Sequence, residues 1–390
     1  MGGVNASFDL LYGAVRDLPV VDWHNHLDSA ALAADEPLGS LHEVWVAPDP
    51  YKHRAMRICG EPERLITGDA PEAEKWAAWM RTLPKLVGNP LFDWAMAELA
   101  LLGLRPDGRT AFGLPENVSL ASLRPSDILR KVHAEVLCPC VGTESLLARG
   151  SLVPGGVAVV PSLRFNAGDD VPDEVLGRFA AAGCRVVDIS VDDASSFVVC
   201  RSSLCRVAAF AASHGWTMLL HLGALRETST RLRAAAGPVG GFAGMRAPVD
   251  PAAVAAFLDA LEREGALPRT ILLTLNPEAH AQLAVLSGSF TREGSPGHVQ
   301  LGPAWWWCDH AHGVRDVLEK TAAYGVLSTF VGMTTDSRSI LSLARHDWFR
   351  RVLCRWIAGK VAAGDYPDDP GLLLPMLEAV CYGNAKRFFQ

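Results

Sequence analysis

The amino-acid sequence predicts a (β/α)8 barrel, and three observations carry this prediction. Eight short apolar runs are spread over the 390 residues, amphipathic stretches of helical length separate most of them, and polar side chains stand where several runs end. Nearly continuous apolar runs are typical of strands buried on both faces, as in parallel sheets. A doubly wound sheet is the alternative, but no glycine-rich dinucleotide turn follows the first run. We therefore predict a single barrel domain over residues 1–390.

The first strand is expected in the run Leu18–Trp23, which leads directly into His24, Asn25 and His26. Alternate residues of an extended strand point the same way, so both imidazoles are expected on one side. Two neutral imidazoles this close form half of a site for a divalent metal such as zinc. Two histidines on a loop or in a core are the alternative, which the triplet alone does not exclude.

A long interval with a helical pattern separates the first run from the second. Helices are expected at residues 71–80 and 93–102. An insertion that follows a barrel strand lies on the C-terminal face, where active sites of this fold are built. We predict a helical insertion over residues 38–130 within the barrel domain.

The remaining strands and helices alternate along the rest of the chain. The strands are expected at 134–138, 157–160, 184–189, 217–221, 270–274, 298–301 and 329–333. The helices are expected at 172–182, 204–213, 251–264 and 312–324. Residues 237–250 contain several glycines and prolines and are expected to form a long loop on the active-site face.

Polar side chains at the strand ends are the candidate functional residues. Arg164 follows the third strand, Asp188 ends the fourth, His221 ends the fifth, and Arg226 comes just after it. The eighth strand leads into Thr334–Arg338. In a barrel these ends meet at one mouth. Singly, Asp188 could cap a helix and Arg164 could form a weak surface ion pair, so the convergence favours a functional site.

A single metal site is predicted from His24, His26 and Asp336, with open positions for water or substrate. We expect His221 to be either a fourth metal ligand or a residue that donates a hydrogen bond to one of the ligands. A binuclear site would need a histidine on the sixth strand, which ends in Leu275 and Asn276. A second pair, His310 and His312, stands before a helical stretch, where alternate residues diverge.

Arginines and aromatic residues indicate an acidic substrate. Arg164, Arg226 and Arg338 carry planar donor groups that suit a carboxylate or a phosphate. In the segment Tyr51–Arg57, Tyr51 could donate a proton to a substrate oxygen, although a helix start with solvated basic residues also fits. The cluster Trp305–Trp307 could stack on a sugar or pack the barrel rim, and both readings stay open.

Composition and charge exclude several classes of function. The net charge is −7 and no basic stripe is visible, which argues against nucleic acid. No apolar run is long enough to span a bilayer, and no signal peptide is evident at the N-terminus. The nine cysteines lack a CxxC spacing, Cys138 and Cys140 being the closest pair. Free thiols in a reducing cytoplasm are therefore expected.

The chain resembles the uronate isomerase (glucuronate isomerase) family of the amidohydrolase superfamily. The resemblance is carried, in order, by Asp22–Leu27, Tyr51–Arg57, Ile66–Gly68, Gly88–Trp94, Pro161–Arg164, His221–Arg226, Ala304–Trp307, Thr335–Ser339, Arg345–Arg351 and Asn384–Lys386. It implies a distorted (β/α)8 barrel that holds one divalent metal, commonly zinc. It also implies interconversion of an aldehyde uronic acid and its keto isomer, such as glucuronate to fructuronate or galacturonate to tagaturonate.

The resemblance also implies roles for individual residues. His24, His26 and Asp336 would be the metal ligands. Asp336, Tyr51, Asp188 and Arg338 would act in catalysis, and Arg164, Arg226, His221 and Trp305 would contact the substrate. The expected partner is a small sugar acid, with neither nucleic acid nor membrane, and a homo-oligomer stays open.

The chain departs from the family pattern at several places, among them Trp23 and Asn25, which replace the usual proline and cysteine of the first motif. Pro50 stands where a histidine usually precedes the tyrosine, and His53 replaces a tryptophan. The acidic loop after the second strand is replaced by Cys138–Glu144. Two other functions are therefore kept open: a metal-dependent hydrolase of the same superfamily acting on an acidic substrate, and a sugar-acid binder without turnover.

Overall fold

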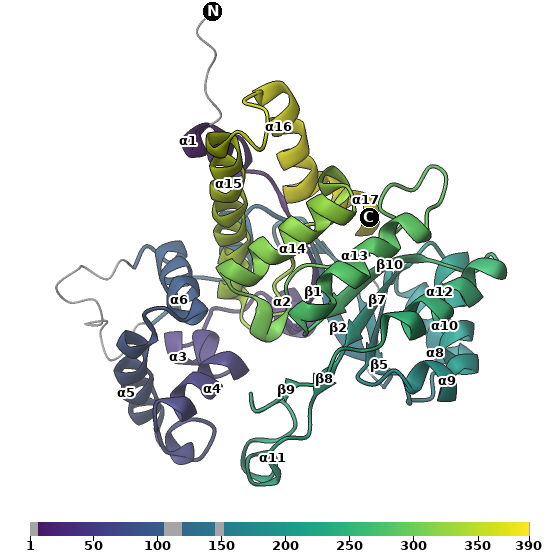
Figure 1. Ribbon diagram of the computed structural model, residues 1–390. Helices are drawn as coiled ribbons and strands as arrows, with labels where there is room; N and C mark the ends of the chain where they lie inside the picture. The colour runs from purple at the N-terminus through teal and green to yellow at the C-terminus, as the bar shows by residue number, and fades with distance from the viewer. Residues whose placement is uncertain (1–6, 105–118, 145–151, 390) are drawn as a thin grey trace, which may run out of the picture.

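A curled, mainly parallel sheet forms the centre of the protein in the computed structural model, which describes residues 7–104, 119–144 and 152–389 (Figure 1). Seven parallel strands follow one another around the sheet in the order β1, β2, β5, β6, β7, β10, β11. Their bounds are Val20–Asn25, Ala134–Gly142, Ser162–Asn166, Val186–Val191, Thr217–Leu222, Arg269–Thr274 and Val299–Leu301. Most side chains of β1, β6 and β7 are buried on both faces, which explains their continuous apolar runs.

The strand predicted at 157–160 is present but short, and β5, which follows it, was not predicted. β4 (Val157–Val159) pairs with the beginning of β2, and β5 pairs with its end. Pro161, which has no N–H to donate, stands between them. Arg164 therefore lies within a strand rather than after one. β3 (Leu152–Val153) adds a short antiparallel edge to β4.

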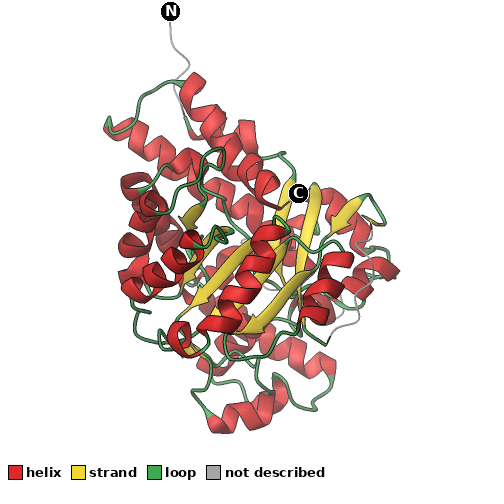
Figure 2. Ribbon diagram, turned by 90° about the vertical axis from the view of Figure 1, so that its right-hand side faces the viewer, coloured by secondary structure: helices red, strands yellow, loops and turns green. Residues whose placement is uncertain are grey.

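Helices alternate with the strands and cover the outer face of the sheet, as Figure 2 shows. These are α8 (Asp173–Ala181), α9 (Ser196–Val199), α10 (Arg201–Ser213), α12 (Pro251–Arg263), α13 (His280–Ser289) and α14 (Ala311–Tyr324). Beyond β7 the chain also forms β8 (Ala224–Leu225), α11 (Thr230–Ala236) and β9 (Gly244–Met245). No helix in the described part of the chain is long and apolar enough to cross a membrane.

Between β1 and β2, where the helical insertion is predicted, the described residues form six α-helices. They are α2 (Ser29–Ala34), α3 (Leu41–Trp45), α4 (Pro50–Ile58), α5 (Glu72–Thr82), α6 (Pro90–Leu101) and α7 (Pro125–Lys131). Several tryptophans of this region, among them Trp45, Trp76 and Trp79, are buried and pack ring against ring. The insertion limits of 38 and 130 stay a prediction.

Both ends of the described chain are tied to the barrel. α1 (Phe8–Val15) packs against α15 (Arg345–Ala363) and α16 (Pro370–Glu378). α17 (Asn384–Phe389) returns to β1, where the ring of Phe389 stacks on that of Trp23 at 5.2 Å.

The expected eighth strand at 329–333 is wrong. A 3₁₀ turn covers Leu327–Thr329, and residues 330–336 belong to neither a helix nor a strand. Gly332 has φ +77°, a left-handed conformation that interrupts a strand. The N–H of Val331 donates to the side chain of Gln300 at 2.8 Å instead of to a neighbouring strand.

Side chains close the barrel where this strand is missing. The carboxylate of Asp22 on β1 accepts hydrogen bonds from Thr334 Oγ1 and from the N–H and Oγ1 of Thr335, at 2.7–2.9 Å. The backbone adds Asp336 N–H to His24 O and His26 N–H to Ser337 O. The segment that carries Asp336 is thereby fixed beside the end of β1.

Candidate active site

A cavity of about 420 Å³ opens at the C-terminal ends of the strands. It brings together residues from the ends of β1, β5 and β7, from α4 and from the segments after β11 and before α15. Its polar lining consists of His24, His26, Tyr51, Arg164, Asn166, His221, Arg226, Glu227, Arg233, Asp336 and Arg338. The tryptophans 305–307 and the loop residues Pro238, Val239, Gly241 and Ala243 add apolar walls. The volume suits a small organic ligand.

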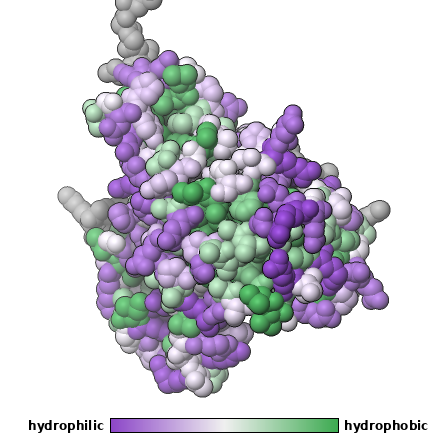
Figure 3. Space-filling view, turned by 45° about the vertical axis from the view of Figure 1, so that its right-hand side comes forward, coloured by the Kyte–Doolittle hydropathy of each residue, from purple (hydrophilic) through white to green (hydrophobic). Residues whose placement is uncertain are grey.

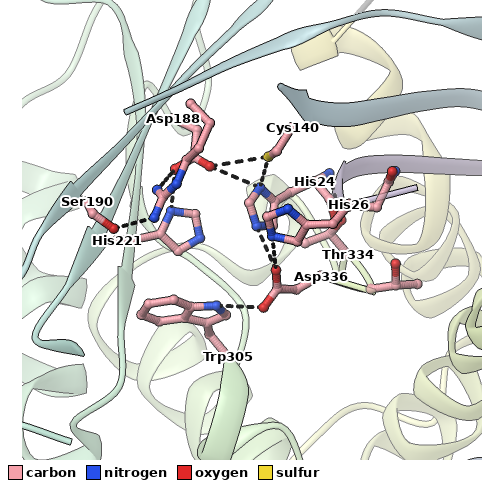
Figure 4. Close-up of polar contacts among 12 residues, drawn as sticks. His24, His26, Cys140, Asp188, Ser190, His221, Trp305, Thr334 and Asp336 are labelled. Carbon is pink, nitrogen blue, oxygen red and sulfur yellow. Dashed lines mark hydrogen bonds and ion pairs between the residues drawn. The ribbon is translucent and has the colours of Figure 1, made fainter. Parts of the chain in front are cut away.

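Asp336 joins the two histidines of the first strand, as Figure 4 shows. Its Oδ1 lies 3.0 Å from His24 Nε2 and 3.1 Å from His26 Nε2. Its Oδ2 accepts a hydrogen bond from Trp305 Nε1 at 2.9 Å. Burial by itself would raise the pKa of Asp336, but the hydrogen bonds from both histidines outweigh it and hold the pKa well below its usual range. The carboxylate is therefore ionised at neutral pH.

Asp188, on β6, is the second carboxylate of the site and is completely buried. Its Oδ1 accepts from Arg164 at 2.5 Å and from His221 Nδ1 at 2.6 Å. Its Oδ2 accepts from Cys140 Sγ at 3.3 Å and lies 3.5 Å from His24 Nδ1. Burial opposes ionisation, yet Arg164 and His221 keep the pKa of Asp188 well below its usual value.

The imidazole of His24 lies between acceptors on both sides. Nε2 faces Asp336, whereas Nδ1 faces Cys140 Sγ at 3.1 Å and Asp188. Burial lowers the pKa of His24, but Cys140, Asp188 and Asp336 outweigh it and raise the pKa well above its usual value. The arrangement thus attracts a positive charge at this ring, and a divalent cation on Nε2 can take the place of the proton.

The surroundings of His221 also suit a bound cation. Its Nδ1 is engaged by Asp188, and burial lowers its pKa to about 4, so the ring is neutral. Its Nε2 is buried and has no hydrogen-bond partner among the described residues. In Figure 4 the ring lies beside the histidine pair, 4.6 Å from the ring centre of His24. Two groups, His24–His26–Cys140 and His24–Asp188–His221, bring ligand atoms close enough for a metal ion.

The three predicted arginines all line the cavity, in different surroundings. Arg164 is bound to Asp188 and Ser190. Arg226 is bound to Asp192 and to Ser190, and its guanidinium lies over the ring of Trp306. Arg338 lines the cavity and has neither a hydrogen bond nor an ion pair among the described residues. Its charge is therefore available to a ligand.

Tyr51 reaches the cavity from the first turn of α4. Asp49 caps this helix through the N–H groups of Tyr51 and Lys52, and Pro50 occupies its first position. The phenol ring packs edge-on against Trp94 and Trp307. Burial, with Asp336 nearby, raises the pKa of Tyr51 well above its usual value, so the hydroxyl is a proton donor.

The alternative reading of this segment, a helix with solvated basic residues, is wrong. Lys52 is 1% exposed and its Nζ binds Asp49 at 2.6 Å and Glu98 at 3.2 Å. Arg57 forms a two-pronged ion pair with Glu63. These ion pairs lie within the insertion, and Arg54 and Arg57 also donate to the backbone oxygens of Ala243 and Gly240 in the loop that lines the cavity.

The remaining predicted residues differ in their placement. Trp305 is almost fully buried and orients Asp336 through its indole N–H, while its ring faces that of His221 at 4.5 Å. His310 and His312 lie outside the cavity, and Nδ1 of His310 accepts a hydrogen bond at the start of α14. Neither belongs to a metal-capable group of the described residues.

The sequence interpretation missed Cys140 and Ser190. Cys140 lies two residues from the end of β2 and contacts both His24 and Asp188. Ser190 links Arg164 to Arg226. Both follow the two-residue spacing of an inward-facing strand side, Cys140 after Cys138 and Ser190 after Asp188, which could have indicated them.

The sequence profile of the glucuronate isomerase family matches residues 3–105 and 186–389. The chain belongs to this family. A uronate isomerase of Caldicellulosiruptor bescii is 34% identical over 96% of this chain and 94% of the relative, and one of Serratia proteamaculans is 33% identical over 97% and 95%. The predicted family and enzyme class are confirmed.

Solved structures support the fold. The crystal structure of uronate isomerase from Thermotoga maritima has a TM-score of 0.83 at 23% identity and covers 100% of this chain and 98% of that chain. Glucuronate isomerase from Caulobacter crescentus gives 0.80 at 20% identity, with 98% and 93% covered. The distorted barrel is therefore confirmed. Residues 106–185, which include Cys140 and Arg164, lie outside the ranges that the family profile matches.

Proposed function

We propose that the protein interconverts a hexuronate aldehyde and its keto isomer through an enediol, at a cavity that holds one divalent cation. Glucuronate to fructuronate and galacturonate to tagaturonate are the two candidate reactions. The observation that carries the proposal is the joining, in one cavity, of His24, His26 and Asp336 with an arginine that lacks an ion-pair partner among the described residues, in a chain of the glucuronate isomerase family.

His24, His26 and Asp336 would hold the cation, with His221 Nε2 as a fourth donor. Two or three imidazoles with one carboxylate are a donor set that suits zinc. When bound, such an ion supplies positive charge that polarises a carbonyl or hydroxyl oxygen of the sugar.

Two side chains would move protons. The ionised Asp336 accepts the proton from C2 as the C2–H bond breaks, and Tyr51 donates its proton to O1 to give the enediol. Tyr51 then takes the proton from O2 as the C2 carbonyl forms, and Asp336 returns its proton to C1. Both residues end in their starting protonation state, as a catalytic cycle requires.

Positive charge would bind and stabilise the acidic sugar. Four arginines line the cavity against the carboxylates of Glu227 and Asp336. Arg338, close to Asp336 in the chain, would stabilise the charge that develops on the enediolate oxygen. Arg164 and Arg226, joined through Ser190, would bind the uronate carboxylate on the opposite side. Asp188, which does not line the cavity, would act by holding Arg164 and His221.

All nine cysteines are free, which fits a reducing compartment, and we extend the proposal to a cytoplasmic location. The substrate would be the partner of this site, a small-molecule sugar acid.

Metal-loaded protein incubated with glucuronate, galacturonate, glucose and galactose tests the proposal. We expect ketose from at least one uronate and a rate at least about 100-fold lower with the neutral sugars, because they lack the carboxylate that the arginines bind. Metal analysis should give about one equivalent of divalent ion per chain. Hydrolysis of acidic lactones or amides without any uronate isomerisation would contradict the proposal.

A further inference from the structure

We propose that Cys140 is a positioning residue of the metal site: its thiol links His24 to Asp188 and fixes the His24 tautomer whose Nε2 binds the cation. The inference rests on the metal site of the proposed function. It concerns a residue that neither the family resemblance nor the family match assigns.

The position of Cys140 follows from the pairing of β2 with its two neighbours. Asn25 at the end of β1 is level with Pro139, and Ser162 of β5 is level with Cys140. The thiol therefore lies between β1, which carries His24, and the β5–β6 side, which carries Asp188. Figure 4 shows the sulfur between the imidazole and the carboxylate.

The contacts of the Cys140 thiol with His24 and with Asp188 are both shorter than the direct contact between His24 and Asp188. Sγ is 3.1 Å from His24 Nδ1 and 3.3 Å from Asp188 Oδ2, whereas Nδ1 and Oδ2 are 3.5 Å apart. A direct Nδ1–Oδ2 hydrogen bond at 3.5 Å is weak. The sulfur offers both a donor and an acceptor, so it can serve both neighbours.

Proton counting then fixes the direction of each hydrogen bond. The S–H of Cys140 donates to Oδ2 of Asp188, whose Oδ1 already accepts from Arg164 and His221. The sulfur lone pair accordingly accepts the Nδ1–H of His24. With its proton on Nδ1, a neutral His24 presents the Nε2 lone pair on the side of Asp336, 3.0 Å away. Hydrogen bonds to the far nitrogen commonly orient metal-bound histidines in this way.

Asp188 thereby fixes the orientation of two imidazoles, those of His24 and His221. It accepts the Nδ1–H of His221 directly and that of His24 through Cys140, so both rings direct Nε2 away from Asp188. Arg164 completes the cluster by donating to Oδ1 of the same carboxylate. Removal of the thiol would leave Nδ1 of His24 with only the long contact to Asp188.

The competing role for this sulfur is direct coordination. His24, His26 and Cys140 bring ligand atoms near one another, so a thiolate ligand is a defined alternative. A cation on the sulfur side would engage Nδ1 of His24 rather than Nε2. The two roles are separated by spectroscopy, because a cobalt ion bound to a thiolate shows a sulfur-to-metal charge-transfer absorption.

The test compares Cys140→Ala and Cys140→Ser with the unmodified protein. Zinc affinity is measured by competition with a chelator, and the cobalt-loaded protein is examined by absorption spectroscopy. We expect zinc affinity to fall about 10- to 100-fold for Cys140→Ala and to recover for the most part in Cys140→Ser, whose hydroxyl can also donate and accept. Cobalt in the unmodified protein should show no sulfur-to-metal band.

Controls separate this inference from the proposed metal site. Cys138→Ala removes a thiol of the same strand from the apolar barrel core and should leave zinc affinity unchanged. Unchanged zinc affinity of Cys140→Ala, equal losses in the Ala and Ser variants, or a sulfur-to-cobalt band in the unmodified protein would each overturn the inference. An unmodified protein that binds no divalent ion, or a His24→Ala variant that binds it equally well, would instead overturn the proposed metal site.

Discussion

At the scale of single residues, the carboxylates of Asp188 and Asp336 have different surroundings, and this decides which of them can reach a substrate. Asp188 is 0% exposed, and Arg164, His221 and Cys140 occupy its oxygens. The side chain of Asp336 is 10% exposed and lines the cavity. Asp336 can reach a substrate, whereas Asp188 acts on its neighbours.

Asp336→Asn should reduce turnover of hexuronate at least about 1000-fold, because the amide neither accepts the C2 proton nor balances the charge of a cation. The melting temperature should stay within a few degrees of that of the unmodified protein. Asp316→Asn, which alters a carboxylate paired with His280 outside the cavity, is the control and should keep full activity. Normal turnover by the Asp336→Asn variant would refute the role of this carboxylate.

The sequence was informative for residues whose position follows from a strand end. His24, His26 and His221 could be grouped because the ends of parallel strands meet at one mouth, and Asp336 joins them although the strand predicted before it is absent. Cys140 was not grouped with them, because a thiol within an apolar strand resembles a core residue in the sequence, and its two-residue spacing from Cys138 was the one signal that could have indicated it. Lys52 was misjudged because burial of an ammonium group depends on carboxylates from elsewhere, one of them Glu98 on α6.

At the scale of elements, the segment in place of the eighth strand links the fold to the site. Its residues 334 and 335 are hydrogen-bonded to Asp22, and Asp336 follows directly. The apolar run at 329–333 predicted a strand because periodicity does not report φ, and Gly332 could not be distinguished from an ordinary strand glycine. β1, β6 and β7 could be predicted because their side chains are buried throughout, whereas β5, with polar residues such as Arg164 and Asn166, was not predicted.

Gly332→Ala tests the importance of this segment. A Cβ at this position would approach Val380 O to 2.3 Å, at a φ of +77°. We expect a loss of about 2–4 kcal/mol in the free energy of unfolding, measured with urea, together with weaker zinc binding.

Gly359→Ala is the matched control, since Gly359 lies within α15 with open space around its Cα. This variant should be more stable by about 0.5–1 kcal/mol. An equal gain for Gly332→Ala would show that the left-handed turn has no structural role.

At the scale of the whole molecule, buried histidines link stability to pH. His53, on α4, is 7% exposed, and burial lowers its pKa to about 4. The imidazole of His53 takes up a proton near pH 6.5 in the unfolded chain, but only near pH 4 in the folded chain. The contribution of a neutral, buried His53 is therefore fully present above about pH 6.5 and is lost as the pH falls toward 4.

His53→Phe should consequently flatten the acid side of the stability curve. Between about pH 6.5 and 4 the unmodified protein should lose up to about 3 kcal/mol more than this variant, measured by urea unfolding at each pH. His214→Phe, at an exposed position after α10, should keep the original slope. Parallel curves for all three proteins would show that His53 is not protonated preferentially in the unfolded chain.

The central claim, proton transfer through an enediol at this cavity, is tested most directly by solvent exchange. The metal-loaded protein is incubated with glucuronate and with galacturonate in D2O, and sugars are followed by NMR. The account predicts ketose carrying deuterium at C1 and recovered aldose carrying deuterium at C2, from at least one of the two uronates. Absence of ketose from both, or ketose formed without any solvent deuterium, would contradict it.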